Sequence, residues 1–484
     1  MKFLSSKIEI IPLRKLINSQ LFIPGSKSIT NRAFLIAGLA KGKSVIKNAL
    51  VSDDTRYMIN ALKELGVKII KKNRNYIIQG KNGKFQLNKE TIRESSLRRT
   101  IFLGNAGTAV RFLTATAALQ NFSIKITGNE RMRERPIQDL IDGLNQLGAK
   151  VYSQKNNGCP PVIIEEPLIG GICSINGQAS SQFFSAILLS APYAKKDVTI
   201  KVIGELVSKP YVNQTIKIMK DFGIEVKSKN YQEFLVKAGQ GYQGREYEVE
   251  ADASSATYFA GIAMLNGGEI TIKNLNPESS QADVNFLEVI KKMGGVIKNS
   301  KFQMTNAKQN PKAKVQNNKR DTYSILHTPY SKMSENELTA VITIKGPKIL
   351  KPLGKINLQN MPDGAMTVAV LCAFAKGKSV LTGLSNLRLK ETDRLKAMTN
   401  ELKKIGCDCR ETADGLIING DPEKLHGAAI ETYDDHRMAM CFAVAGTKIE
   451  GIKIKNPSCV KKTYPRFWKD LEKMGIKLQV YSMT

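Results

Sequence analysis

One pattern recurs six times along the chain, and it constrains the fold more than any single motif does. Each copy contains a segment with apolar residues three and four apart, which predicts a helix with one buried face. A glycine and a short apolar stretch follow, as in "YMINALKELGVKII" and "FWKDLEKMGIKL". Glycine adopts the left-handed backbone conformation that ends a helix without steric cost. We therefore expect this conformation at Gly66, Gly148, Gly223, Gly294, Gly406 and Gly475.

A second helix precedes each of these in the repeat. Three of its copies read "ITNRAFLIAGLA", "SSQFFSAILLSA" and "HRMAMCFAVAG", with small and apolar residues on nearly every side. A helix without a polar face is expected to be buried. A short alternating strand such as "KSVIKN" follows each copy. The unit is therefore predicted to be a buried helix, a strand, a surface helix and a strand, and six units favour an α/β protein with two domains of three units each.

Two intervals between the repeat glycines are longer than the others. The first contains the polar stretch "KNGKFQLNKETIRESSLRR" at 81–99, and the second contains a polar segment near 301–345. Both are predicted to be loop insertions rather than further repeats. The length of 484 residues also exceeds what one ordinary core accommodates, in agreement with two domains.

The composition favours a soluble protein with anionic partners. No run of eighteen apolar residues is present and the first fifteen residues do not resemble a signal peptide, so we expect a cytoplasmic protein without a membrane span. Lys and Arg number 73 against 43 Asp and Glu, a net charge of +30, which is typical of proteins that bind nucleic acid, acidic membranes or phosphorylated metabolites. The seven cysteines and three histidines lack metal-binding spacing, so no metal is predicted.

Basic residues gather at the starts of the predicted helices. "PGSKS", "LGNAGT" and "NMPDG" precede buried helices, whereas "RMRERP" and "KKTYPR" precede surface helices. The N–H groups and the dipole at a helix N-terminus favour an anion, so cations placed there need a compensating ligand. If the helix starts converge on one face, the cations form a single site for phosphate and carboxylate groups. These cations are Lys27, Arg111, Arg135, Lys390, Arg394, Arg437 and Lys462.

Carboxylates accompany these cations at two places. Glu391 stands in the dense stretch "NLRLKETDRLKA" (386–397), where neighbouring charges can set its pKa for proton transfer. Asp363 stands at a helix start in "MPDG". Taken singly, the first stretch also fits a surface helix with internal ion pairs, and Asp363 fits a helix cap. Asp53 and Asp54 in "SDDT" are expected to be ordinary caps without a basic partner.

Nine motifs follow one another in the order known from one enzyme family: "PGSKSITNRA", "LGNAGTAVR", "RMRERP", "ASSQFFSAILL", "VSKPY", "MPDGAMT", "NLRLKETDRL", "YDDHRMAM" and "KKTYP". Over essentially its whole length, apart from the two insertions, the chain closely resembles the 5-enolpyruvylshikimate-3-phosphate synthases. The resemblance implies the two-domain α/β enolpyruvyl transferase fold, with six repeated βαβαββ-type units and pseudo-threefold symmetry in each domain. It also implies chain crossings near Pro24 and Glu250, so that residues 1–24 and 250–484 form one domain and residues 25–249 form the other.

The resemblance implies an enzyme of the shikimate pathway of aromatic amino acid biosynthesis, a 3-phosphoshikimate 1-carboxyvinyltransferase. Such an enzyme transfers the enolpyruvyl group from phosphoenolpyruvate to the 5-hydroxyl of shikimate 3-phosphate and releases phosphate. No redox change occurs, so no cofactor is expected, and we expect a monomer without a specific nucleic-acid or membrane partner. Because Gly107 is retained, sensitivity to the phosphonate inhibitor glyphosate is also expected. Phe112 is a departure, since many family members have proline there.

The site residues that match the family's motifs fall into two sets. For shikimate 3-phosphate they are Lys27, Ser28, Arg32, Ser180, Ser181, Gln182, Ser208, Tyr211, Asp363, Asn386 and Lys390. For phosphoenolpyruvate they are Lys27, Gly107, Arg135, Gln182, Arg394, Arg437 and Lys462. By the same resemblance the catalytic residues are Asp363 as general base for the attacking hydroxyl, Glu391 as proton-transfer group near the methylene carbon, and Lys27.

Two other functions stay open at this point. A UDP-N-acetylglucosamine enolpyruvyl transferase shares the fold and the donor, but it typically uses a loop cysteine that the stretch "GNERMRERP" lacks, and "KETDRL" favours the shikimate enzyme. A basic nucleic-acid-binding repeat protein is suggested by the net charge. Against it, the aromatic residues that would stack on bases are sparse beside the basic motifs.

Overall fold

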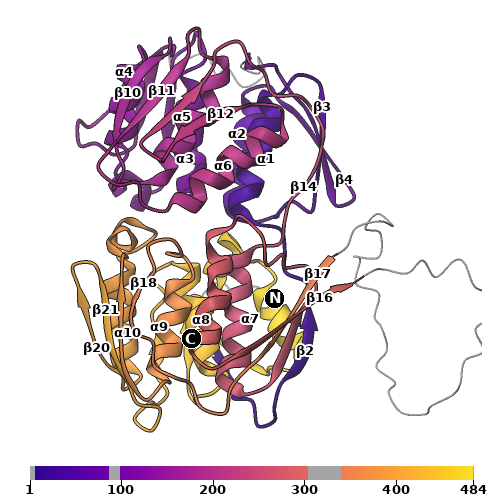
Figure 1. Ribbon diagram of the computed structural model, residues 1–484, viewed down its shortest axis with the longest axis vertical. Helices are drawn as coiled ribbons and strands as arrows, with labels where there is room; N and C mark the ends of the chain where they lie inside the picture. The colour runs from indigo at the N-terminus through magenta and orange to yellow at the C-terminus, as the bar shows by residue number, and fades with distance from the viewer. Residues whose placement is uncertain (1–5, 87–98, 303–338, 483–484) are drawn as a thin grey trace, which may run out of the picture.

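The chain is folded into two lobes, which are joined by two neighbouring segments (Figure 1). The computed structural model describes residues 6–86, 99–302 and 339–482. One lobe contains the chain from α1 to β14, and the other contains β1, β2 and the chain from α7 onward. Each lobe buries its own cluster of apolar side chains. The two clusters support the predicted division near residues 24 and 250, whose boundaries stay a prediction.

Six four-stranded sheets share one topology, in which the first two strands are parallel and the other neighbours are antiparallel. In the first lobe the sheets are, in strand order, β14 (Glu246–Glu248), β3 (Lys43–Lys47), β5 (Asn75–Gln79) and β4 (Lys68–Lys72); β6 (Arg99–Phe102), β7 (Ile124–Thr127), β9 (Val162–Glu166) and β8 (Lys150–Ser153); and β10 (Gly171–Asn176), β11 (Val198–Ile203), β13 (Glu233–Val236) and β12 (Val226–Lys229). In the second lobe they are β2 (Asn18–Leu21), β15 (Glu269–Ile272), β17 (Thr339–Lys345) and β16 (Val296–Phe302); β18 (Gly354–Asn357), β19 (Gly377–Thr382), β21 (Gly415–Gly420) and β20 (Asp408–Thr412); and β22 (Ala429–Ile430), β23 (Lys453–Lys455), β1 (Ser6–Ile10) and β24 (Leu478–Ser482). This arrangement confirms the six βαβαββ-type units.

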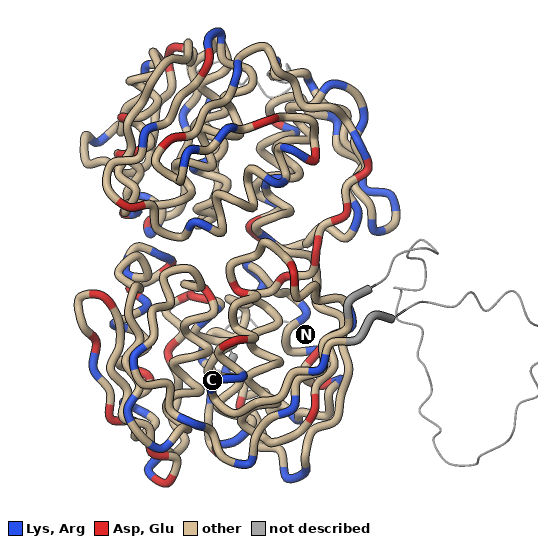
Figure 2. The backbone as a smooth tube through the Cα atoms, viewed as in Figure 1, with Lys and Arg blue, Asp and Glu red and all other residues tan. Residues whose placement is uncertain are grey.

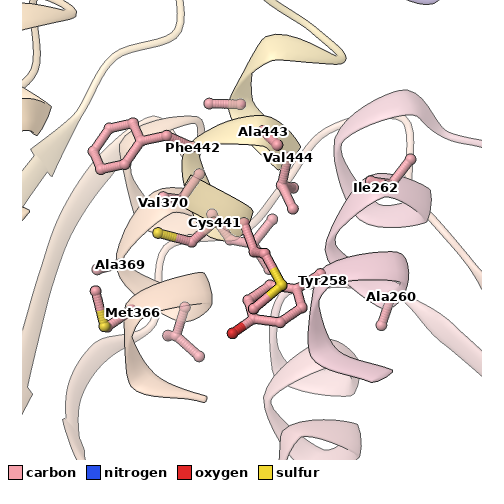
Figure 3. Packing of buried hydrophobic residues seen from close by; sticks show 14 of the residues in the cluster. Tyr258, Ala260, Ile262, Met366, Ala369, Val370, Cys441, Phe442, Ala443 and Val444 are labelled. Carbon is pink, nitrogen blue, oxygen red and sulfur yellow. The ribbon is translucent and has the colours of Figure 1, made fainter. Parts of the chain in front are cut away.

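The helices alternate between the interior and the surface, as the apolar periodicity predicts. The interior helices are α1 (Lys27–Leu39), α3 (Gly107–Ala117), α5 (Ser181–Ser190), α7 (Ala253–Asn266), α9 (Ala365–Ala373) and α11 (His436–Gly446). The amphipathic helices are α2 (Asp53–Glu64), α4 (Gln138–Gln146), α6 (Lys209–Asp221), α8 (Phe286–Lys292), α10 (Arg394–Lys404) and α12 (Phe467–Lys473). In the second lobe α7, α9 and α11 pack against one another through residues such as Tyr258, Met366 and Val444 (Figure 3). The interior helices of three repeats therefore form one core in this lobe.

The two segments that join the lobes are hydrogen-bonded to each other. The Ser26 N–H donates to the Glu250 carbonyl at 2.8 Å, and the Asp252 N–H donates to the Pro24 carbonyl at 2.9 Å. A Cβ at Gly25 would lie 1.9 Å from the carbonyl oxygen of Asn48, so the close approach requires glycine. This pairing brings the start of α1 in one lobe beside the start of α7 in the other.

Two expectations about the repeat differ from the structure. After every surface helix but the last, the apolar stretch forms a first strand that pairs with a second, antiparallel strand further along the chain, as β4 does with β5. After α12 the described residues contain one strand, β24, and β1 takes the place of the second. The boundary predicted for the second insertion, near residue 345, was wrong. Thr339–Lys345 is strand β17, in which Ile342 and Ile344 are fully buried. Most of both insertions lies outside the described residues. The six repeat glycines have φ between 82° and 95°, which confirms the left-handed conformation.

Two of these glycines provide a matched test of the repeat's helix ends. Alanine at either position places a Cβ in the left-handed region, which costs about 1–2 kcal/mol. At Gly406 the added Cβ would also lie 2.3 Å from the Lys424 carbonyl oxygen, whereas at Gly475 it meets open space. We therefore expect Gly406→Ala to lower the free energy of unfolding by about 1–3 kcal/mol more than Gly475→Ala does. Urea unfolding measures the difference, and equal losses would contradict the argument.

Candidate active site

Helix starts from both lobes face two adjoining pockets, with volumes of about 310 and 340 Å³. The first pocket is lined by Ser26, Lys27, Ser28, Tyr211, Gln214, Asp252, Ser254, Gln281, Ala282, Asp283, Asp363 and Arg437. The second pocket is lined by Lys27, Asp54, Gly107, Thr108, Arg135, Gln182, Asp363, Lys390, Glu391, Arg394 and Arg437. Lys27, Asp363 and Arg437 line both and therefore stand at their junction. Residues more than 400 positions apart in the sequence are brought together here.

Asp363 lies at the junction and is the acceptor for two arginines. Its carboxylate pairs with Arg437 at 2.7 Å and with Arg394 at 3.2 Å, and it accepts a hydrogen bond from the Tyr211 hydroxyl at 3.3 Å. Burial opposes ionisation, but the charges of Arg437 and, after it, Lys390 hold the pKa of Asp363 below its usual value. The carboxylate is therefore ionised at neutral pH and able to accept a proton from a group in the first pocket.

A second carboxyl group, Asp283, holds the chain next to Asp363 and was not predicted from the sequence. Its Oδ1 accepts a hydrogen bond from the Gly364 N–H at 2.9 Å, and it also binds the Ser254 hydroxyl. Burial and then the charge of Asp363 raise the pKa of Asp283 to about 6. The residue lies in the short 3-10 helix Ala282–Asn285 that leads into α8, where the sequence shows an acidic residue without a basic neighbour.

Glu391 lies in the second pocket between two cations. It pairs with Arg394 at 2.9 Å and with Lys462 at 3.6 Å, and its side chain is 8% exposed. Burial favours the neutral form, yet Arg394 and Lys462 hold the pKa of Glu391 well below its usual value. Arg394 in turn pairs with Asp435 at 2.7 Å, a fully buried carboxylate that caps α11. These contacts place a proton-transfer group among the cations that would hold an anion.

The interpretation of Asp53 and Asp54 as ordinary caps without a basic partner was wrong. The cap of α2 is Ser52, and Asp53 forms an ion pair with Arg56. Asp54 is buried and pairs with Lys462 at 3.0 Å and with Lys27 at 3.6 Å. Lys462 belongs to the other lobe, 408 positions away, so the local motif carried no signal for this contact.

Gly107 and Arg135 lie together on the other side of the second pocket. A Cβ at Gly107 would come within 2.6 Å of the Arg135 guanidinium. Arg135 donates to the Asn105 side-chain oxygen at 3.0 Å, and the Asn105 carbonyl accepts from Lys462 at 2.6 Å. The glycine therefore provides the space in which Arg135 reaches the pocket, and Asn105 joins it to the other lobe.

Lys390 is enclosed by both lobes. Burial lowers the pKa of its ammonium group to about 8, against the opposing charge of Asp363. Arg131 reaches across from the first lobe and donates to the Lys390 carbonyl at 3.0 Å and to the Glu391 carbonyl at 3.1 Å. Sequence reasoning missed Arg131, although it stands in the motif "RMRERP" that supplied Arg135.

Some predicted residues lie behind the pockets rather than in their walls. Arg32 is buried and donates to Thr215 at 2.7 Å and to the Ser28 hydroxyl at 2.7 Å. Ser180 caps α5 and Ser181 is the first residue of that helix. Across the lobes, the Asn386 amide donates to the Ser208 hydroxyl at 3.5 Å, and this hydroxyl donates to the Gln359 carbonyl at 3.4 Å.

The prediction that Arg111 belongs to the anion-binding cations was wrong. Its guanidinium is buried and donates to the Pro136 carbonyl at 2.9 Å and to the Gly107 carbonyl at 3.3 Å. The side chain thereby holds the loop that carries Arg135 against the start of α3. Arg111 lies one turn after the start of α3, and those carbonyl groups set the direction of its side chain.

Two lobes of three repeats each, with a cationic cavity between them, define an enolpyruvyl transferase. A family model described as EPSP synthase (3-phosphoshikimate 1-carboxyvinyltransferase) matches residues 13–471. The 3-phosphoshikimate 1-carboxyvinyltransferase of Sulfurovum sp. (strain NBC37-1) is 41% identical over 97% of this chain and 99% of its own length, and that of Escherichia coli O1:K1 / APEC is 39% identical over 94% and 95%. A solved EPSP synthase structure from Acinetobacter baumannii superposes with a TM-score of 0.75 at 25% identity, covering 99% of this chain and 100% of that one. The chain belongs to the EPSP synthase family.

The family carries the activity expected from the motifs. The enzyme transfers the enolpyruvyl group of phosphoenolpyruvate to shikimate 3-phosphate in the shikimate pathway, and both substrates are small anions. The alternatives of a UDP-N-acetylglucosamine enolpyruvyl transferase and a nucleic-acid-binding protein are not favoured. Figure 2 shows Lys and Arg spread over both lobes, with Asp and Glu among them. Over the described ranges, no helix has the length and apolar character needed to span a membrane.

Proposed function

We propose that the first pocket holds shikimate 3-phosphate and that the second holds phosphoenolpyruvate, with the reacting atoms at their junction. The observation that carries this proposal is the composition of the second pocket. Every residue matched to phosphoenolpyruvate lines it except Lys462, and Lys462 contacts Asp54 and Glu391, which do line it. Ser28, Tyr211 and Asp363, matched to shikimate 3-phosphate, line the first pocket. Lys27 stands between the two and would contact both anions.

Holding two anions side by side is the first task of such a site. The substrates repel each other through their phosphate and carboxylate charges, so cations from both lobes must offset this repulsion. Arg135 and Arg394 come from different lobes and line the same pocket. Fixed at one junction, the attacking hydroxyl and the acceptor carbon react as an intramolecular pair, which removes much of the entropic barrier.

Asp363 is proposed to accept the proton of the attacking 5-hydroxyl. Its low pKa, due to Arg437 and Lys390 against the effect of burial, keeps it ionised. The developing alkoxide oxygen forms the bond to C2 of phosphoenolpyruvate as its proton passes to Asp363. Tyr211, hydrogen-bonded to the same carboxylate, orients it.

Glu391 is proposed to deliver a proton to C3 of phosphoenolpyruvate. Protonation of the methylene carbon develops positive character at C2, which the hydroxyl oxygen attacks. The product again contains a methylene group, so the proton added at C3 must leave when the C2–O bond to phosphate breaks, and Glu391 can take it back. The proton that Asp363 took from the hydroxyl passes to the departing phosphate, which leaves as hydrogen phosphate. A Glu391 that donates must first be protonated. A bound substrate anion attracts Arg394 and Lys462 and weakens their interaction with Glu391. This raises the pKa of Glu391 and favours its protonated form.

The oligomeric state and location also belong to this proposal. Residues of one chain line both pockets, so we propose that the monomer is active. We also propose that the protein acts in the cytoplasm, without a cofactor and without a specific nucleic-acid partner. Sedimentation velocity measures the oligomeric state, and activity confined to a dimer would contradict the proposal.

The amide variant Glu391→Gln tests the role of this residue. It removes the transferable proton and keeps the shape of the side chain, so kcat is expected to fall by about 10²–10⁴-fold while shikimate 3-phosphate still binds. Phosphate release that requires both substrates measures kcat, and calorimetry measures binding. Glu411→Gln, which changes a glutamate paired with Arg388 away from the pockets, is the control and should keep full turnover. Undiminished turnover of Glu391→Gln would refute the role.

The buried ammonium of Lys390 predicts a pH dependence on the alkaline side. With a pKa of about 8, Lys390 carries its charge below that pH and loses it above. A phosphate monoester is already a dianion there, so the substrate's own charge does not change. Because Lys390 lines the second pocket, the KM for phosphoenolpyruvate should stay nearly constant up to about pH 7, about double by pH 8 and rise about tenfold by pH 9. Lys390→Arg keeps its charge and should flatten the profile, whereas an unchanged rise in this variant would count against Lys390.

Glyphosate is proposed to bind the same cations as phosphoenolpyruvate. Phe112 is fully buried and lines neither pocket, with its ring centroid 5.0 Å from the Arg32 guanidinium, and Gly107 leaves the space beside Arg135 open. The chain should therefore be sensitive to the inhibitor. Gly107→Ala displaces Arg135 and should raise the KM for phosphoenolpyruvate and the inhibition constant about tenfold or more. Growth of an auxotroph complemented with the unaltered chain, if unaffected by glyphosate, would contradict the proposal.

A further inference from the structure

Glu401 is a buried carboxylate on α10, outside both pockets. Its side chain is 0% exposed. It accepts hydrogen bonds from the Tyr433 hydroxyl at 2.7 Å and from the Glu431 N–H at 3.0 Å, and it pairs with Lys404 at 2.8 Å. Partners of this kind offset the loss of hydration that burial imposes on a carboxylate. Glu401 therefore ties the chain around residues 431–433 to α10.

The segment tied in this way contains a strained turn. Tyr433 and Asp434 have φ of 52° and 53°, and the Asp435 N–H donates to the Thr432 carbonyl at 2.8 Å. Two successive residues with positive φ that close such a bond form a type I′ turn, in which glycine and asparagine are favoured. Tyrosine at the first central position must be held there by its contacts. The residue is 39% exposed, so partial burial and the hydrogen bond to Glu401 together hold it in this conformation.

The turn leads directly into two cations of the second pocket. Asp435, its last residue, is fully buried and accepts a hydrogen bond from Arg394 at 2.7 Å. Asp435 also caps α11 by accepting from the Arg437 N–H at 2.9 Å. The Arg437 guanidinium then reaches Asp363 at 2.7 Å. A change in the turn is therefore transmitted to both guanidinium groups.

We propose that Glu401 is a positioning residue for the phosphoenolpyruvate side of the site and acts through the turn at 432–435. The proposal rests on the assignment of the second pocket made above. Arg394 and Glu401 are seven residues apart on α10, so their side chains lie on one face of the helix. Arg394 binds the end of the turn and Glu401 binds its beginning. The helix and the turn form one unit, and the geometry of this unit determines where Arg394 and Arg437 point.

Glu401→Gln and Tyr433→Phe test the tie itself. In Glu401→Gln the amide oxygen can still accept at the Oε1 position, but the NH2 group that replaces Oε2 faces two donors, the Glu431 N–H and the Lys404 ammonium. The tie is therefore weakened, and the KM for phosphoenolpyruvate is expected to rise about tenfold. Tyr433→Phe removes one hydroxyl from a partly exposed ring and should raise the same KM about threefold. The KM for shikimate 3-phosphate should stay within about twofold in both variants. Wild-type kinetics in both variants, or equal changes in both KM values, would overturn the proposal.

A rescue separates positioning from a general loss of stability. Glycine adopts positive φ without strain, so Asp434→Gly should make the turn less dependent on its tie. In that background the effect of Glu401→Gln on the KM for phosphoenolpyruvate should shrink to about twofold, and an undiminished effect would overturn the proposal. Tyr152→Phe is the matched control, because it removes a tyrosine–glutamate hydrogen bond of 2.9 Å in the other lobe and should change neither KM.

Arg135→Lys, measured alongside, distinguishes the two proposals, because Arg135 lines the second pocket and not the first. If this variant raises the KM for phosphoenolpyruvate while Glu401→Gln and Tyr433→Phe leave it unchanged, the positioning role fails and the pocket assignment stands. If Arg135→Lys instead raises only the KM for shikimate 3-phosphate, the assignment of the second pocket fails. The role of Glu401 as stated here fails with it.

Discussion

The interaction on which the rest of the structure depends is the pairing of buried cations with buried carboxylates between the lobes. Arginines and lysines crowded into one cavity repel one another and lose hydration, and each such charge is costly unless it is paired. Asp54, Asp363 and Glu391 supply the pairing, and each of them contacts two cations. Asp54 in one lobe binds Lys462 of the other, so the same ion pairs that offset the charge also connect the lobes.

The repeat explains how so many charges reach one place. Each βαβαββ unit presents its helix starts at the same end of its sheet, and three units in each lobe bring those ends together. A residue's distance along the chain then matters less than its position in the unit. Lys27 and Arg394 come from different units and line one pocket because each is the first residue of its helix. Lys462 instead reaches Asp54 and Glu391 from the end of the 3-10 helix Pro457–Lys462.

Much of the fold was predictable from the sequence, because the signals for it are local. Apolar periodicity and helix-ending glycines are local properties, so the six units and their helix starts could be derived from short stretches. Contacts across the cavity are not local. Asp54 was interpreted as a cap because its partner, Lys462, is in the last unit, and Arg111 was placed among the substrate cations although backbone carbonyls direct it away from them. The residue patterns missed the second strand of the units and the strand Thr339–Lys345, because short apolar stretches do not reveal where strands turn, although the family resemblance had implied two strands at the end of each unit.

The pairing of charges also bears on how the proposed proton donor is prepared. Arg394 and Lys462 keep the Glu391 carboxylate ionised, although a group that gives a proton to carbon must first be protonated. A bound anion competes for those cations and weakens their hold on the carboxylate, so its pKa rises when the substrate that needs the proton is present. Asp363 differs because Arg437 contacts it at the junction of the pockets and favours the ionised form required of a base. Two carboxylates in one cavity can then take opposite roles, because they share Arg394 but differ in their second cation, which is Lys462 for Glu391 and Arg437 for Asp363.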